Sequence, residues 1–259
     1  LLVQAGTGTG KSLGYLAPTI AHAVLDDEAV VVATATLALQ AQLAGKDIPA
    51  ALTAAEKVLP RRPRAAVLKG RHNHACLHKV RGGSSRPDQD MLLDDADSSA
   101  ARSDGKGTDQ ASELGAEVIA LRQWAEQQAA ENGVGDRDDA PAHSQQAWDQ
   151  VSMRANECLG AQNCPFGPQC LAERARERAR DADIVVTNHA MLAIDAMNGG
   201  TLLPEHDVVV IDEAHEVADR FTGAASVDLW PGRLSTVARQ GLTWLDDDLG
   251  ADLLDQVDV

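Results

Sequence analysis

Apolar, mostly β-branched residues gather in five short runs along the chain. Each run is apolar at successive positions rather than at alternate ones, and turn residues or helical patterns separate the runs. Strands buried on both faces are typical of a parallel sheet that helices cover on each side. The pattern therefore predicts an α/β fold with strands at residues 1–4, 29–35, 65–69, 183–188 and 207–212.

Helical patterns connect these runs, at residues 10–25, 36–45, 168–182 and 189–197. Pro18 lies inside the first helix and is expected to kink or end it, because proline lacks a backbone donor. Residues 70–167 do not follow the alternation of strands and helices. Within them, apolar residues near helical spacing predict a helix over 113–132, namely Leu114, Val118, Leu121 and Trp124.

Two stretches of this insertion, 82–112 and 133–144, are polar and poor in large apolar residues. Such segments bury too little apolar surface to offset the entropy of the chain, so we expect both to be mobile. The predicted organisation is an α/β domain made of residues 1–75 and 171–222. A lobe of residues 76–170 interrupts it, and a helical region, 223–259, follows it.

The formal net charge of −16 argues, taken alone, against a nucleic-acid partner. The charge is unevenly distributed, however. Residues 88–139 hold fourteen acidic and four basic side chains, whereas residues 61–81 hold seven basic side chains and no acidic one. A local basic surface is compatible with contacts to a phosphate backbone, and we expect Lys69 and Arg71 to make them.

No apolar run is long enough to span a bilayer, and the glycine-rich start is unlike a secretory signal. We therefore expect a cytoplasmic protein without a membrane partner, in which cysteines stay reduced. The chain starts without a methionine and at a predicted strand, so we also expect it to be a fragment.

The string AGTGTGKS at residues 5–12 follows a predicted strand and opens a predicted helix. In that context the pattern predicts a phosphate-binding loop for ATP. The backbone N–H groups expected to surround the β-phosphate are those of Gly6, Thr7, Gly8, Thr9 and Gly10. Lys11 would neutralise the β- and γ-phosphates, and the Ser12 hydroxyl would ligate Mg²⁺. An ordinary turn of small residues is the alternative.

The string VVVIDEAH at residues 208–215 places two acidic residues at the carboxyl end of a strand, where open parallel sheets bind ligands. Asp212 is expected to hold Mg²⁺, and Glu213 to orient and deprotonate the attacking water. His215 either caps or packs locally, or couples hydrolysis to DNA contact. A capped turn could explain the two acids alone, but the loop at 5–12 favours ATP hydrolysis.

The four cysteines are Cys76 and a group of three, Cys158, Cys164 and Cys170, with five residues between successive members of the group. Four thiolates can bind a tetrahedral Zn²⁺ or an iron–sulfur cluster, and four reduced structural thiols are a third possibility. Zinc fingers typically contain a Cys-x-x-Cys pair, and none occurs here. The spacing therefore favours a bound cofactor wider than a single ion.

Together, AGTGTGKS and DEAH resemble the signature pair of superfamily 2 helicases. The strings KGRHNHAC at 69–76 and VVTNHAML at 185–192, with the cysteine group, resemble the XPD/DinG branch. The resemblance extends from residue 1 to about residue 220. It implies a RecA-like P-loop NTPase sheet with helices on both faces and an inserted, largely helical iron–sulfur lobe. It also implies ATP-dependent movement along single-stranded DNA, 5′ to 3′, with unwinding at duplex junctions.

The resemblance implies further roles for particular residues. Cys76, Cys158, Cys164 and Cys170 would ligate a [4Fe-4S] cluster. Thr34 and Thr36, in a string like helicase motif Ia, would contact a DNA phosphate, although Thr36 could equally be a plain N-cap. Residues 223–259 resemble the start of the arch insertion of the family.

A complete motor of this kind needs a second RecA-like domain. No string like its QxxGRxxR motif occurs here. We expect that domain in the full-length chain, which we expect to be a monomer, and we expect this chain alone to hydrolyse ATP poorly. The rival interpretation is a nucleotide-switched nucleic-acid-binding module with a four-cysteine zinc site.

Overall fold

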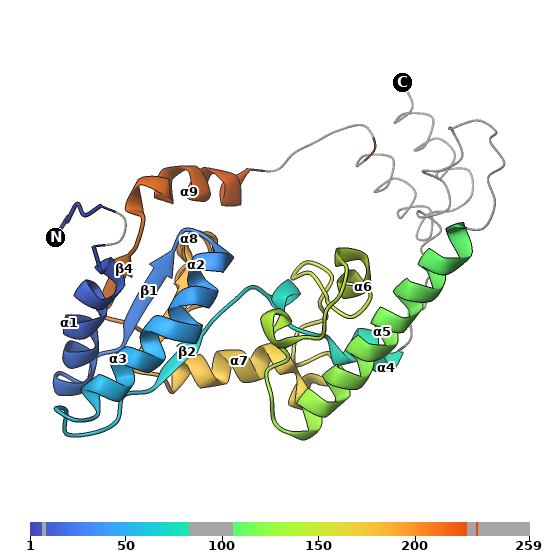
Figure 1. Ribbon diagram of the computed structural model, residues 1–259, viewed down its shortest axis with the longest axis horizontal. Coiled ribbons are helices and arrows are strands. Elements are labelled where there is room, and N and C mark those ends of the chain that lie inside the picture. The colour runs from blue at the N-terminus through green and yellow to red at the C-terminus, as the bar shows by residue number, and fades with distance from the viewer. Residues whose placement is uncertain (7–8, 83–105, 227–231, 233–259) are drawn as a thin grey trace. The chain divides into compact units, whose positions relative to one another are not determined.

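The computed structural model describes residues 1–6, 9–82, 106–226 and 232 (Figure 1). Within these residues, four parallel strands form one sheet in the order β2-β3-β1-β4. The strands are β1 (Val30–Thr34), β2 (Ala65–Val67), β3 (Ile184–Asn188) and β4 (Val208–Ile211). Four of the five predicted strands are thereby confirmed.

The register of the sheet brings the carboxyl ends of its strands to one edge. Val30 pairs with Ile184 on one side and with Val208 on the other, and Thr34 pairs with Asn188 at the far end of β1. The segments that follow β1, β3 and β4 therefore leave the sheet side by side. Ligands of open parallel sheets bind at this edge.

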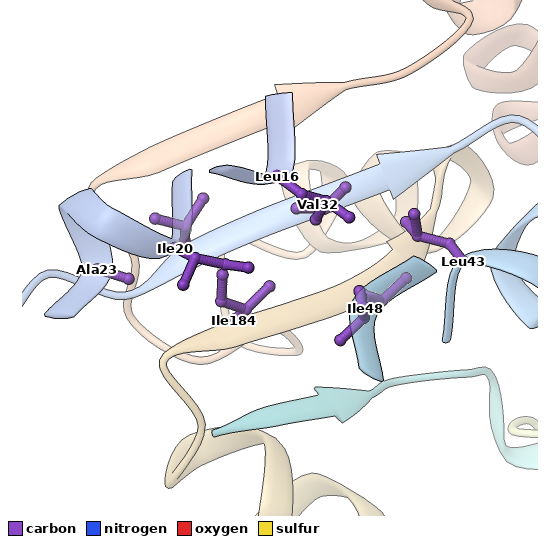
Figure 2. Packing of buried hydrophobic residues seen from close by; sticks show 9 residues of the cluster. Leu16, Ile20, Ala23, Val32, Leu43, Ile48 and Ile184 are labelled. Atoms are coloured by element: carbon purple, nitrogen blue, oxygen red, sulfur yellow. The ribbon is translucent and has the colours of Figure 1, made fainter. Parts of the chain in front are cut away.

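Helices cover both faces of the sheet, as the two-sided burial of the strands predicts. On one face, α1 (Lys11–Leu25) and α3 (Ile48–Ala55) contribute side chains that pack on Val32 and Ile184 (Figure 2). On the other face, α7 (Leu171–Arg180) and the segment that follows it pack Ala179 and Ala182 against Val31 and Val185. The expected α/β fold class is confirmed.

The remaining helices are α2 (Leu37–Gln42), α4 (Leu77–Gly82), α5 (Lys106–Ala130), α6 (Gln145–Asp149), α8 (His189–Met197) and α9 (Val217–Ala225). A π-helical turn, Leu43–Asp47, joins α2 to α3, and short 3₁₀ segments are Arg71–Asn73, Arg137–Asp139, Gly167–Gln169 and Ala214–Glu216. Helix α1 continues through Pro18, so proline does not end this helix.

The predicted first strand, residues 1–4, is also wrong. These residues have no regular secondary structure, and the apolar side chains of Leu1, Leu2 and Val3 are exposed. A strand needs a neighbouring backbone to pair with, and β4, at the edge of the sheet, pairs only with β1 among the described residues. The apolar run by itself was therefore an insufficient signal.

The inserted lobe has its own apolar core, formed by α4, α5, α6 and the start of α7. Trp148 is 1% exposed, packs beside Leu121 and Leu171, and donates a 2.7 Å hydrogen bond from Nε1 to the carbonyl of His72. Leu114, Val118 and Trp124 border the same core. The helix predicted at 113–132 is confirmed, with an earlier start.

The two stretches expected to be mobile have different outcomes. Residues 83–105 of the first stretch lie outside the described residues, and residues 106–112 form the first turns of α5. Residues 133–144 contain a 3₁₀ turn, and Asp136 forms an isolated β-bridge with His74. The second expectation is wrong because polar side chains here bind partners from distant parts of the chain.

The chain divides into two compact units, Leu1–Phe221 and Thr222–Val259. Most of the second unit, including most of the predicted helical region at 223–259, lies outside the described residues. Among the helices that are described, none has the length and apolar character needed to cross a membrane.

Candidate nucleotide-binding site

The glycine-rich loop leads directly into α1. Gly10 is the N-cap of the helix and adopts φ = 79°, a left-handed conformation that glycine tolerates without a Cβ clash. Thr9 Oγ1 donates a 2.8 Å hydrogen bond to the carbonyl of Gly6. Lys11 and Ser12 are the first two helical residues. Two members of the predicted loop, Thr7 and Gly8, lie outside the described residues.

The acidic string follows β4 at the same edge of the sheet. The N–H of Asp212 extends the pairing of β4 with β1 through a 2.9 Å hydrogen bond to the carbonyl of Ala33. Glu213 then adopts φ = 51° and ψ = 47°, a left-handed conformation that is uncommon for a residue with a side chain. The turn directs the two carboxyl groups toward α1.

Lys11 and Glu213 form an ion pair between Nζ and Oε1, although the two residues are far apart in sequence. The hydrogen bond from Lys11 lowers the pKa of Glu213, and the hydrogen bond to Glu213 raises the pKa of Lys11. Both groups are therefore charged near neutral pH. The structure brings together the lysine and the acidic residue that the sequence predicted as partners in one site.

Tyr15 is a member of this site that the sequence analysis missed. Its hydroxyl donates a 3.3 Å hydrogen bond to Asp212 Oδ2. Burial, then the charge of Asp212, raise the pKa of Tyr15, while a hydrogen bond with Ser12 opposes that rise. Tyr15 follows Lys11 by four residues, so both side chains lie on one face of α1. That spacing was the available signal.

His215 lies close to Glu213, with 3.5 Å between Nδ1 and Glu213 Oε2, and its side chain is 73% exposed. At this exposure it is not a core histidine. An exposed imidazole beside an acidic residue is available to a bound partner, so the expected role in coupling stays a prediction.

The two threonines expected to contact DNA face different surroundings. Thr34 is 1% exposed, and its hydroxyl donates a 3.1 Å hydrogen bond to the carbonyl of Thr36. Thr36 is the N-cap of α2, and its Oγ1 accepts a 3.2 Å hydrogen bond from the N–H of Leu39. The Thr34 hydroxyl is turned inward, which corrects its assignment as a direct phosphate contact.

Lys69 also points into the protein, contrary to the expectation of a DNA contact. Its ammonium group lies 2.7 Å from both Asp136 Oδ1 and Asp138 Oδ2, and its side chain is 4% exposed. Arg71 pairs with Glu173 at the start of α7. Acidic residues distant in sequence therefore neutralise the basic string KGR. These ion pairs join the sheet to the inserted lobe.

The four cysteines are free thiols and partly exposed. Burial is the main cause that raises the pKa of Cys76, and the charges of Cys170 and Cys158 raise it further. Cys170 is the N-cap of α7. Among the described residues, no group of three or more His, Cys, Asp or Glu side chains is gathered closely enough to hold a metal ion.

The loop between the cysteines is tightly folded. A Cβ on Gly167 would lie 1.9 Å from the carbonyl oxygen of Ala161, so only glycine fits there. The N–H of Gly160 donates a 3.4 Å hydrogen bond to Cys158 Sγ, and Arg71 interacts with the charges of Cys158 and Cys170. A backbone hydrogen-bond donor and a cation beside the cysteines fit an anionic iron–sulfur centre.

A lysine that follows a glycine-rich loop and faces two carboxyl groups, at the carboxyl edge of a parallel sheet, is the arrangement typical of P-loop nucleotide-binding proteins. Residues 61–234 match the DEAD_2 family, and the chain belongs to that family.

Three relatives illustrate the similarity. The chain is 46% identical over 247 residues to the "ATP-dependent helicase DinG" of Mycobacterium tuberculosis, a match that covers 93% of this chain and 35% of the relative. It is 34% identical over 223 residues to the "ATP-dependent DNA helicase YoaA" of Escherichia coli, covering 85% and 30%. It is 32% identical over 238 residues to the "ATP-dependent DNA helicase DinG" of Photobacterium profundum, covering 87% and 31%. The chain thus spans about a third of the length of these curated relatives.

Proposed function

We propose that this chain is the nucleotide-binding part of the motor of an ATP-dependent DNA helicase of the DinG type. The complete helicase would contain a second RecA-like domain, act in the cytoplasm as a monomer, and move 5′ to 3′ on single-stranded DNA toward duplex junctions. The observation that carries the proposal is the contact of Lys11 with Glu213 beside Asp212, in a member of the DEAD_2 family.

In this proposal, ATP binding exchanges the partner of Lys11. The ammonium group leaves Glu213 and binds the β- and γ-phosphates, which carry more negative charge than one carboxylate. Glu213 is then free to orient a water molecule for attack on the γ-phosphorus. It accepts a proton from that water as the bond between the γ-phosphorus and the ADP oxygen breaks. Its pKa, lowered by Lys11 in the present arrangement, would rise when the lysine moves away.

Asp212 and Ser12 are the residues that would hold Mg²⁺, and Tyr15 would orient Asp212 through its hydroxyl. The bound ion would neutralise charge that develops on the phosphates. A carboxylate and a hydroxyl are the oxygen ligands that Mg²⁺ prefers.

The test of this function is ATP hydrolysis by the complete helicase with and without single-stranded DNA. A motor that tracks DNA should hydrolyse ATP faster when the strand is present. A nucleotide-switched module with a zinc site should show no stimulation, and that result would refute the helicase proposal.

We further propose that Cys76, Cys158, Cys164 and Cys170 hold a [4Fe-4S] cluster that fixes the inserted lobe. Beside the larger effect of burial, the charges of Cys170 and Cys158 raise the pKa of Cys76, and the loop 158–170 is constrained at Gly167. The cluster would be structural in this role. The resemblance to XPD/DinG helicases supports the assignment, and zinc is the competing metal.

Metal analysis should distinguish the two metals. Anaerobically purified helicase should be brown and contain about four irons per chain, whereas a protein with a zinc site would be colourless and contain about one zinc. Replacing Cys170 with serine should remove most of the iron. The matched control is His72→Gln, near Cys76, which should leave the iron content unchanged.

The buried position of Lys69 leads to a prediction about stability. Lys69→Met should lower the free energy of unfolding by about 3 kcal/mol, because Asp136 loses its buried counter-charge. Thermal unfolding measures this change, and Lys46→Met on an exposed lysine is the control. DNA affinity should not change. If the variant bound DNA more weakly, and the slope of log affinity against log salt concentration fell by about one, Lys69 would be a phosphate contact after all.

A further inference from the structure

His189 lies outside the phosphate loop and the acidic string, yet it contacts the nucleotide site. It is the first residue of α8, directly after β3, and its side chain is fully buried. Asn188 before it caps the helix by accepting a 2.9 Å hydrogen bond from the N–H of Met191. Helix α8 lies beside β1 (Figure 1). The cap and the preceding strand together fix the backbone that carries the imidazole.

The imidazole binds the backbone of the acidic string. His189 Nε2 lies 2.9 Å from the carbonyl oxygen of Asp212. Because a carbonyl only accepts, Nε2 carries the hydrogen in this contact. Burial lowers the pKa of His189, and the carbonyls of Asp212 and Ala33 partly offset that effect, so the ring is neutral near pH 7.

The contact fixes one peptide unit at both of its polar ends. The carbonyl of Asp212 accepts from His189, and the N–H of Glu213, in the same peptide unit, donates a 3.0 Å hydrogen bond to Asp212 Oδ1. The preceding N–H, that of Asp212, is held by Ala33. The rotation of this peptide plane sets the direction of both carboxyl groups.

Glu213 needs such a constraint because its left-handed conformation is unfavourable for a residue with a Cβ. A conformation of this kind persists only where the surrounding structure holds it. We propose that His189 is the positioning residue that holds the Asp212–Glu213 peptide plane and thereby directs Glu213 toward the attacking water. This inference rests on the proposed function.

Two variants of the complete helicase test it through DNA-stimulated ATP hydrolysis. His189→Leu removes the donor and should lower kcat by about 10- to 100-fold with little change in KM, because the water is misdirected while the phosphate contacts remain. His189→Gln retains an N–H at a similar distance from the backbone and should recover most of kcat. A purely structural role would not separate the leucine and glutamine variants in this way.

His189→Asn covers the case in which the leucine variant does not fold. Its shorter amide does not reach the Asp212 carbonyl, so it should behave as a variant without the contact, and thermal unfolding checks that it is folded. An unchanged kcat in the folded leucine or asparagine variant, or a glutamine variant as slow as these, would overturn the role of His189 alone. A wild-type helicase that does not hydrolyse ATP would overturn the proposed function as well.

Discussion

A Glu213→Gln variant of the complete helicase should bind ATP at least as tightly as the wild type and hydrolyse it about 10²- to 10⁴-fold more slowly. The amide cannot accept the proton of the attacking water, which accounts for the loss of kcat. The amide also carries no charge, so Lys11 does not have to break an ion pair before it binds phosphate. ATP affinity is therefore not reduced. Single-turnover hydrolysis and equilibrium nucleotide binding measure the two effects separately.

The matched control is Glu216→Gln, because Glu216 lies three residues further along the same turn and pairs with Arg220. Its kcat should stay within about twofold of the wild type, since it holds no reacting group. Turnover retained by Glu213→Gln would remove Glu213 from the role of general base. Loss of ATP binding in the same variant would contradict the exchange of partners at Lys11.

Replacing Lys11 with alanine should reduce kcat by about 10²- to 10³-fold or more, because the ammonium group stabilises charge that develops on the transferred phosphoryl group. ATP affinity should fall as well, since the β- and γ-phosphates lose a charged donor. The protein should remain folded, because both Lys11 and Glu213 are partly exposed and water can solvate the remaining carboxylate.

Hydrolysis at saturating ATP in the presence of single-stranded DNA measures the effect of this substitution, with thermal unfolding as the check on folding. Lys57→Ala, on a surface lysine outside the site, is the control and should behave as the wild type. An active Lys11→Ala variant would contradict the assignment of residues 5–12 as the phosphate loop.

The two halves of the nucleotide site could be predicted because each is a local signal. A loop such as 5–12 needs only closely spaced glycines before a helix, and an acidic pair after an apolar strand needs only the sequence 208–213. The sequence could not show that Tyr15 completes the site. Its contact to Asp212 depends on where α1 lies relative to β4, and packing across the sheet decides that.

At Lys69 and Arg71, by contrast, the local signal was misleading. Lys69 and Arg71 lie in a basic string without a single local acid, which resembles an exposed binding surface. In the folded chain, Asp136 and Asp138 reach Lys69, and Glu173 reaches Arg71. Composition within a window cannot reveal charges that arrive from a separate segment of the chain.

The sequence by itself determined the layered α/β fold, the positions of four strands and the candidate phosphate loop with its acidic partner. Hydrophobic burial on two faces and the special geometry of glycine act over a few residues, so they can be read in order along the chain. Only the tertiary structure decided which polar groups face inward, that residues 133–144 are held by ion pairs, and that His189 supports Asp212. Those outcomes depend on pairs of groups that are distant in sequence and become neighbours only when the sheet and the lobe are assembled.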